Sequence, residues 1–381
     1  MKCEKTLHDR LEKEIKKLLE KGVLEGVFPA AAAGICCGLG KEQKEIISFY
    51  GKASNLPKKR LLKKRYFFDL ASLTKPFATT MAVLSLIKEK KIDLDETLPS
   101  LLERKIKDEK KRITTRHLLS HCSGLPAHRE YFNILKDIPS KEKNNFIENI
   151  IMQEKLENSP GKAAIYSDIG FMLLGCVIEK KGGCNMAQYV SEKIMEPLRL
   201  EKKIFYNHLL QGRQKTKSID FVATENCPWR KKILCGEVHD DNCYTLDGVA
   251  GHSGLFGNIE GVTAYTGLIL EMWKGKTKHP NINKEDLEYF LTKQEDIPES
   301  SWVLGFDTPA EKESSCGSYF SQKSIGHLGF TGTSFWLDPE KNVGIVLLTN
   351  RVHPSRKNSK IKQFRPFFHD RVMEKLFSLS T

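Results

Sequence analysis

The sequence predicts an α+β protein in which one antiparallel sheet is flanked by helices and carries an inserted all-helical domain. Segments typical of strands occur near both ends of the 381-residue chain, at 28–52 and 302–349, and the stretch between them has mostly helical periodicity. Because strands from both ends must share a sheet, we expect a discontinuous α/β sheet domain, 1–75 with 290–381, and a mainly helical domain, 76–289.

The first elements follow from local patterning. Residues 4–22 place apolar side chains at helical spacing among charged ones, which predicts an amphipathic helix. Residues 28–52 alternate short apolar runs around Gly38-Leu39-Gly40, which predicts a hairpin. The dense basic segment 57–65 is interpreted as a solvated loop.

The remaining elements are predicted from the same periods. Helical spacing recurs in the middle of the chain, at 81–90, 144–156, 170–180 and 262–273. Strand-like runs then appear at 302–306, 324–337 and 342–349, and a closing helix at 364–377.

Charge and composition narrow the function classes. The chain has 61 Lys plus Arg against 48 Asp plus Glu, a formal charge of +13, and a hydrophobic content of 40% that excludes a disordered chain. Much of the excess charge lies in local runs at 58–65 and 105–112, without interleaved aromatic residues. We therefore expect a solvated basic surface and no nucleic-acid partner.

The cysteines and the N-terminal segment bear on the cellular compartment in which the protein is expected. Ten cysteines include no C-x-x-C pair, and several, such as Cys36 and Cys37, lie in apolar runs, so free thiols are expected and a metal site is not. The first residues lack the apolar stretch of a secretion signal, and the apolar run 27–39 is too short to span a bilayer. These features predict a soluble cytoplasmic protein.

The strongest chemical signal is a serine three residues before a lysine. This S-x-x-K spacing occurs at Ser72, Ser140 and Ser359. The last two lie in highly polar stretches, where nothing would desolvate a lysine. Ser72 lies in the apolar stretch 67–78, which leads into a helical pattern.

A helix that begins near Ser72 would suit a nucleophile. Unpaired N–H groups and the positive end of the helix dipole stabilise an alkoxide-like serine. Lys75 would project from the same face, so that its amine approaches the hydroxyl, and Pro76 is tolerated only in a first turn. The structural alternative is that Ser72 merely caps the helix and Lys75 is a surface residue.

Two further segments support the catalytic interpretation. Tyr166 and Asp168 precede a helical pattern, and His327 lies in a glycine-rich strand-like segment, Gly326-His327-Leu328-Gly329-Phe330. The order S-x-x-K, Y-S-D and H-x-G resembles the penicillin-recognising serine hydrolases: class C β-lactamases, D,D-peptidases and related esterases. The segments 113–126, 238–242 and 248–256 extend this resemblance over most of the chain, and it implies a β-lactamase/transpeptidase-like fold.

The resemblance also implies roles for individual residues. Ser72 would be the acylated nucleophile, and Lys75 and Tyr166 would form the proton-transfer network, in which Tyr166 is favoured as the base or alkoxide activator. The N–H groups of Ser72 and Phe330 would form the oxyanion hole. Asp168, His327, Gly329 and Phe330 are the expected substrate-binding residues. Such chemistry requires no metal and no organic cofactor.

Three residues depart from the class C pattern. Asp168 replaces an asparagine, cannot donate a hydrogen bond when ionised, and would favour a protonated Lys75. His327 replaces a lysine and is expected to titrate near neutrality, and Leu328 replaces a threonine. The resemblance therefore implies acyl hydrolysis of an ester or a peptide/amide substrate, such as a cell-wall-derived peptide or a β-lactam. The alternative is a catalytically weak sensor that binds peptidoglycan fragments or penicillins.

Overall fold

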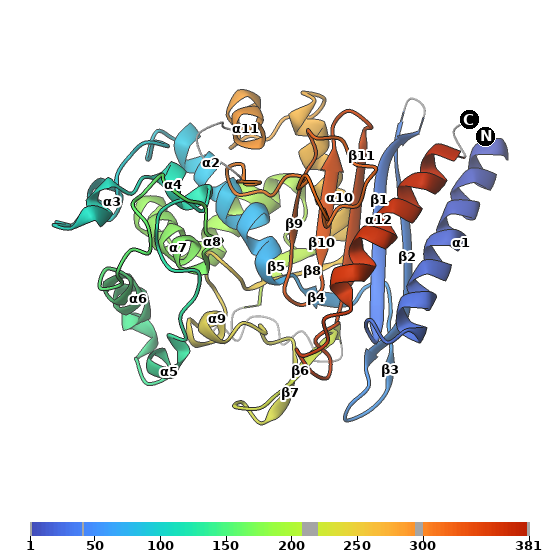
Figure 1. Ribbon diagram of the computed structural model, residues 1–381, viewed down its shortest axis with the longest axis horizontal. Coiled ribbons are helices and arrows are strands. Elements are labelled where there is room, and N and C mark those ends of the chain that lie inside the picture. The colour runs from blue at the N-terminus through green and yellow to red at the C-terminus, as the bar shows by residue number, and fades with distance from the viewer. Residues whose placement is uncertain (1, 40–41, 208–219, 294–299, 379–381) are drawn as a thin grey trace.

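The computed structural model describes residues 2–39, 42–207, 220–293 and 300–378. Its centre is a six-stranded sheet in the order β3-β2-β1-β11-β10-β9 (Figure 1). The strands are β1 (Ala30–Leu39), β2 (Glu42–Ser54), β3 (Arg60–Leu61), β9 (Ile325–Leu328), β10 (Ser334–Asp338) and β11 (Val343–Thr349). All paired strands run antiparallel.

The two ends of the chain meet at the middle of this sheet. β1 pairs with β11, with Ala31 opposite Thr349 and Cys37 opposite Val343. This pairing confirms the predicted α+β class and the assembly of one antiparallel sheet from both ends of the chain. The hairpin of β1 and β2 is also confirmed, although Gly40 of the predicted turn lies outside the described residues.

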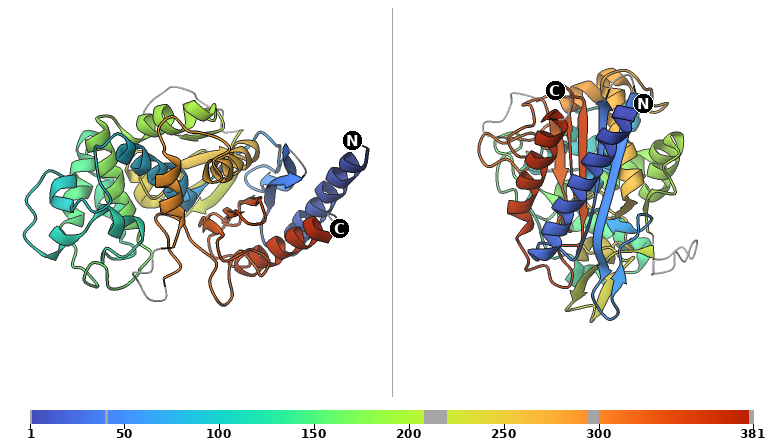
Figure 2. Two further views of the ribbon diagram at one scale, coloured as in Figure 1. Left: turned by 90° about the horizontal axis from the view of Figure 1, so that it is seen from above. Right: turned by 90° about the vertical axis from the view of Figure 1, so that its right-hand side faces the viewer.

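Helices cover both faces of the sheet. On one face α1 (Lys2–Leu24) and α12 (Ile361–Ser378) lie side by side (Figure 2), and on the other α10 (Ile259–Trp273) packs on β1 and β11. The close approach of α10 requires a glycine, because a Cβ at Gly34 of β1 would lie 1.7 Å from the Thr263 Oγ1. The predicted helices near both ends of the chain are thus confirmed.

A helical region lies beyond α10, away from α1 and α12 (Figure 1). Its α-helices are α2 (Met81–Lys88), α3 (Leu98–Leu101), α4 (Thr115–Leu119), α5 (Phe132–Leu135), α6 (Lys143–Ile151), α7 (Asp168–Gly182), α8 (Met186–Val190), α9 (Asp241–Thr245) and α11 (Lys284–Leu291). Six further helices in the described segments are of the 3-10 or π type: Ala71–Leu73, Lys75–Thr80, Glu109–Arg112, Ser140–Glu142, Ser191–Met195 and Glu196–Leu198. The four helices predicted for the middle of the chain are all present, with somewhat different ends.

The middle of the chain also contains strands that the periodicity did not predict. They are β4 (Phe67–Asp69), β5 (Ile204–Tyr206), β6 (Ala223–Cys227), β7 (Lys232–Cys235) and β8 (Leu255–Asn258), and they form a three-stranded sheet and a two-stranded sheet. In addition, α10 falls within the range 76–289 but packs on the central sheet. The proposed domain boundaries, 1–75 with 290–381 and 76–289, therefore do not describe the packing of α10. The division into these two domains stays a prediction.

Two strand predictions near the C-terminal end need correction. The run 302–306 is not a strand, because Trp302 makes only an isolated bridge to Asp307. The run 324–337 is not one strand but two, β9 and β10, which are joined by a turn at 329–333. Gly332 has a φ of 103° in this turn, a conformation that glycine adopts without strain. The turn places the end of β9 beside the segment that carries Ser72.

Within the described part of the chain, none of the helices combines the length and the apolar character that crossing a membrane requires.

Candidate active site

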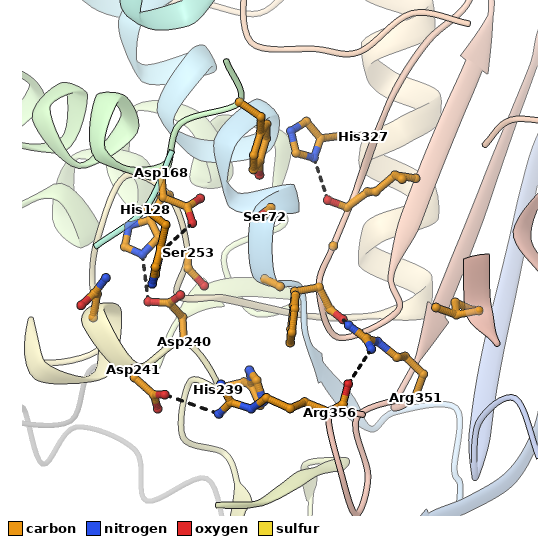
Figure 3. A pocket seen from close by; sticks show the side chains of 18 of the residues that line it. Ser72, His128, Asp168, His239, Asp240, Asp241, Ser253, His327, Arg351 and Arg356 are labelled. Atoms are coloured by element: carbon orange, nitrogen blue, oxygen red, sulfur yellow. Dashed lines mark hydrogen bonds and ion pairs between the residues drawn. The ribbon is translucent and has the colours of Figure 1, made fainter. Parts of the chain in front are cut away.

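A cavity of about 650 Å³ lies between the end of β9 and the helical region (Figure 3). Most of the residues that the sequence predicted for the site line it: Ser72, Tyr166, Asp168, His327, Gly329 and Phe330. Lys75 lies beneath this wall and is fully buried. In Figure 3, Asp168 and His128 lie on one side of Ser72 and His327 on the other.

Ser72 sits in a tightly constrained turn. It is the middle residue of the 3-10 turn Ala71–Leu73, and the π-helix Lys75–Thr80 and then α2 follow it. The preceding residue, Ala71, has a φ of 48°, in the left-handed region that non-glycine residues rarely adopt. Asp69 supports the strained turn, because its Oδ1 accepts the Ala71 N–H at 2.8 Å. The prediction that a helix begins near Ser72 is confirmed, although the first turns are not α-helical.

Lys75 connects the serine to a carboxylate. Its Nζ donates to the Ser72 Oγ at 3.0 Å, to the Asp168 Oδ1 at 2.7 Å and to the His252 carbonyl oxygen at 3.1 Å. Burial by itself would lower the pKa of Lys75, but the Asp168 carboxylate outweighs it and raises the pKa. Lys75 is therefore a cation in the resting site.

Asp168 lies at the start of α7, where Ser167 caps the helix by accepting the Gly170 N–H at 3.1 Å. Its second oxygen, Oδ2, is 3.4 Å from the Nδ1 of His128. Burial would raise the pKa of Asp168, but the charge of Lys75 and the hydrogen bond from His128 hold it well below the usual range. The same hydrogen bond raises the pKa of His128. Asp168 is therefore an ionised carboxylate between two basic groups.

Tyr166 is packed in an aromatic cluster above Lys75. Its ring centroid is 4.7 Å from that of His121 and 5.3 Å from that of Trp302, and the Lys75 Nζ lies 4.8 Å from it. Burial raises the pKa of Tyr166, while the charge of Lys75 and hydrogen bonding to Lys75 and Ser72 oppose this shift. The resting tyrosine is a neutral phenol that contacts both groups.

His327 belongs to β9 and is only 1% exposed. Its Nδ1 lies 2.9 Å from the Leu328 carbonyl oxygen, and its Nε2 has no partner among the described residues. Burial, with the nearby Lys75 charge, lowers the pKa of His327 to about 3. The expectation that His327 titrates near neutrality is therefore wrong, because a buried imidazole beside a cation stays neutral.

The end of β9 approaches the serine segment closely. A Cβ at Gly329 would lie 1.9 Å from the Thr333 Oγ1 and 2.8 Å from the Leu70 carbonyl oxygen, so only glycine fits there. The next residue, Phe330, has a half-exposed ring, and its N–H has no acceptor in the described protein. Phe330 lines the cavity, and a free main-chain N–H is the kind of donor that an oxyanion hole requires.

Several residues of the site were not found by sequence analysis. Asp240 binds the His252 Nε2 at 2.9 Å, and both side chains line the cavity together with His128 and Trp302. No motif marks these residues, since each reaches the site only through the folding of distant segments. His252 and Asp240 lay in segments that the family resemblance had singled out, and this was the only available signal.

The fold and this arrangement of serine, lysine and tyrosine are those of a serine hydrolase. Residues 15–365 match the family described as Beta-lactamase, and the chain belongs to this family. The resemblance seen in the sequence is thus confirmed, and so is the coarse assignment as a serine hydrolase.

Curated relatives and solved structures agree with the family. The chain is 32% identical over 369 residues to the N-acetylmuramyl-L-alanine amidase of Bacillus subtilis (strain 168), covering 90% of this chain and 81% of the relative. It is 32% identical over 308 residues to the putative D-alanyl-D-alanine carboxypeptidase of Escherichia coli (strain K12), covering 75% of this chain and 69% of the relative. The structure of the octameric penicillin-binding protein homologue from Pyrococcus abyssi superposes with a TM-score of 0.68 at 19% identity, covering 92% of this chain and 76% of that chain.

Proposed function

We propose that this serine hydrolase cleaves an amide bond in a cell-wall-derived peptide through an acyl-enzyme on Ser72. The observation that carries this proposal is the contact of 3.0 Å between the Ser72 Oγ and the Lys75 Nζ at the wall of the cavity. A serine that faces a buried cation is stabilised as its oxygen gains negative charge. Esters and β-lactams, which are acylating agents of the same kind, would react with the same serine.

Tyr166 is the proposed proton shuttle. As the Ser72 Oγ attacks the carbonyl carbon, its proton passes to the Tyr166 hydroxyl oxygen, and the phenolic proton passes to the leaving nitrogen. Because acceptance and donation are coupled, the neutral phenol can act without first becoming a phenolate. Lys75 remains protonated and stabilises the negative charge. The N–H groups of Ser72 and Phe330 bind the carbonyl oxygen as it becomes an oxyanion.

Hydrolysis of the acyl-enzyme repeats this shuttle in reverse. A water molecule attacks the ester carbon and gives a proton to Tyr166, while Tyr166 returns its own proton to the Ser72 oxygen. The acyl group leaves as a carboxylic acid, and the serine is restored. All proton transfers use side chains of the chain itself.

The substrate class is supported by two considerations. The two relatives described above carry names for amide hydrolysis in cell-wall material. The cavity, at about 650 Å³, is large enough for a peptide of a few residues. Its walls carry both carboxylates, such as Asp240 and Asp241, and a partly exposed guanidinium group, that of Arg356, which suits a substrate with charges of both signs.

The test is a substrate panel run on wild type, Ser72→Ala and Ser140→Ala. Muramyl-L-alanine peptides, D-Ala-D-Ala peptides, p-nitrophenyl esters and nitrocefin would be compared. Ser140 is a matched control, because it also has a lysine three residues on but lies in a polar stretch outside the cavity. We expect turnover of a cell-wall peptide that Ser72→Ala abolishes and Ser140→Ala preserves. Equal turnover by wild type and Ser72→Ala would disprove the proposal.

The second candidate function is a catalytically weak sensor of peptidoglycan fragments. It is favoured by one observation, the ion pair that keeps Lys75 protonated and so removes a possible lysine base. A sensor would form a stoichiometric adduct with a fluorescent penicillin and release it slowly. Multiple turnovers of a peptide or ester per Ser72 would exclude the sensor.

A further inference from the structure

Two arginines at the cavity wall are buried, and among the described residues neither has a carboxylate partner. Arg365, on α12, is 6% exposed, and Arg351, just after β11, is 9% exposed. All the hydrogen bonds that their guanidinium groups make within the described segments go to main-chain carbonyl oxygens. Burial lowers the pKa of Arg365 to about 9, so the cation persists at neutral pH despite its cost.

Three of the carbonyls that these arginines bind, those of Gly329, Phe330 and Thr333, belong to the loop after β9. Arg365 donates to the Gly329 oxygen at 2.8 Å and to the Thr333 oxygen at 2.9 Å. The Gly332 N–H also donates to the Gly329 oxygen, at 3.0 Å, and the Arg351 Nε donates to the Phe330 oxygen at 2.7 Å. Two successive carbonyls are therefore held in fixed directions.

The Gly329 carbonyl and the Phe330 N–H belong to the same peptide group. In a planar trans peptide these two bonds point in opposite directions, so fixing the carbonyl oxygen also fixes the N–H. A cation that binds the carbonyl oxygen also polarises the amide and makes its N–H a stronger donor. Arg365 thus acts on an amide of the cavity wall whose N–H has no acceptor among the described residues.

The same loop is tied to the turn that carries the serine. The Thr331 hydroxyl donates to the Asp69 carbonyl oxygen at 2.8 Å, and the Thr333 hydroxyl donates to the Leu70 carbonyl oxygen at 3.0 Å. Asp69 and Leu70 lie just before Ala71 and Ser72. The two N–H groups proposed for the oxyanion hole are therefore held in register with each other by buried hydrogen bonds.

We infer that Arg365 is a positioning residue that orients and polarises the Gly329–Phe330 peptide, so that the Phe330 N–H stabilises the oxyanion formed on the substrate. This inference rests on the proposed function, since it assigns a role within the same reaction. Arg365 does not touch the substrate in this scheme, and its contribution is transmitted through one peptide group.

The test compares Arg365→Met and Arg365→Lys with Arg371→Met. Arg371 is a matched control on the same helix, where it is exposed and paired with Glu374. Rates would be measured with a p-nitrophenyl ester and divided by the number of serines labelled by a fluorophosphonate, so that partial unfolding does not lower the result. We expect Arg365→Met to lose kcat by about 10- to 100-fold with KM nearly unchanged, and Arg365→Lys to lose less.

Two further measurements separate a positioning role from a purely structural one. A phenylboronic acid places a tetrahedral oxygen in the oxyanion hole, so its affinity should fall by a factor similar to that of kcat in Arg365→Met. Phe330→Pro removes the N–H, and in that background Arg365→Lys should have no further effect on the rate per labelled serine.

The inference is overturned if both Arg365 variants turn over at the wild-type rate per labelled serine, or if the Arg365→Lys and Phe330→Pro effects multiply. The double-mutant comparison uses only Arg365→Lys and Phe330→Pro. It therefore tests the role of Arg365 even if Arg365→Met does not fold. The proposed function fails by a different result, namely retained turnover in Ser72→Ala.

Discussion

The Lys75 Nζ and the Asp168 Oδ1 lie 2.7 Å apart, with the lysine fully buried and the carboxylate at the cavity wall. By the resemblance noted in the sequence, class C β-lactamases carry an asparagine at the position of Asp168. The ion pair holds Lys75 as a cation. For this reason the proposed mechanism gives the proton transfer to Tyr166 and the stabilisation of negative charge to Lys75.

Replacing this carboxylate should make activity sensitive to the charge of Lys75. In Asp168→Asn, burial is no longer opposed by a counterion, so the pKa of Lys75 falls. A lysine with a lowered pKa is a cation only below that pKa, so the stabilising charge is lost as pH rises. We expect kcat at neutral pH to fall roughly tenfold or more and to recover at lower pH, as a pH profile of kcat would show.

The control is Asp247→Asn. Asp247 pairs with Lys143, also at 2.7 Å, but lies outside the cavity. It has a φ of 61°, which asparagine tolerates well. An Asp168→Asn profile that matches those of wild type and Asp247→Asn would contradict the proposed role of the Lys75 charge.

If activity depends on pH near neutrality, the group that titrates should be His128 and not His327. The carboxylate of Asp168 raises the pKa of His128, whereas burial lowers that of His327 to about 3. Protonated His128 adds positive charge near the reacting carbonyl, so kcat/KM should rise as pH falls through the His128 pKa. His128→Gln should flatten that part of the profile, and His327→Gln should leave its position unchanged. The opposite pattern would show that the assignment is reversed.

The sequence was sufficient for the fold where pattern and chain order both applied. Strand-like runs near both ends of the chain predicted that the two ends share one sheet, as the pairing of β1 with β11 shows. The prediction that the middle of the chain is mainly helical was also largely correct. The run that contains Trp302 was misread, because its apolar residues are buried in a loop and not in a strand. Trp302 packs against Tyr166 and His121 instead, a tertiary contact that local periodicity does not encode.

Residues of the site could be predicted only where the interacting residues are close in the sequence or lie in segments that carry the family resemblance. The contact between Ser72 and Lys75 follows from their spacing, and the structure shows it. The protonation state of His327 depends on burial and on the Lys75 charge, which no sequence window contains. His128 and Arg365 reach the site from distant segments, so their contacts with Asp168 and Gly329 require the folded chain.

Asp69 should matter both for stability and for activity. Its Oδ1 accepts the Ala71 N–H at 2.8 Å and its Oδ2 accepts the His239 N–H at 2.6 Å, while the side chain is buried. Asp69→Asn supplies only one acceptor oxygen, so one buried N–H loses its partner at a cost of about 1–3 kcal/mol. Urea unfolding should show this loss, and kcat per labelled serine should also fall because the strained turn relaxes.

Asp338→Asn is the control for Asp69→Asn. Asp338 is also a fully buried carboxylate that accepts main-chain N–H groups, from Ser321, Glu340 and Lys341, but it lies outside the cavity. We expect its loss of stability without a change in kcat per labelled serine. Equal effects of the two variants on kcat would refute a specific role of Asp69 in holding the serine turn.

His369 should make the fold sensitive to acid, although its side chain does not line the cavity. It is fully buried on α12, its Nδ1 donates to the Ser315 carbonyl oxygen at 3.1 Å, and burial lowers its pKa from 6.5 to about 3. Between these two values the unfolded chain binds a proton that the folded chain does not, so the free energy of unfolding falls as pH falls. From pH 7 to pH 5 this histidine should cost roughly 2 kcal/mol.

The variant His369→Asn removes the titration but can keep a donor near Ser315. We expect the loss of unfolding free energy between pH 7 and pH 5, measured by urea denaturation, to be about 2 kcal/mol smaller than in wild type. Phe368→Leu, a change at a neighbouring buried residue of α12, should lower stability by a similar amount at both pH values, because no proton is involved. If His369→Asn and wild type lose equal stability on acidification, His369 does not remain neutral in the fold, and the acid sensitivity must come from other groups.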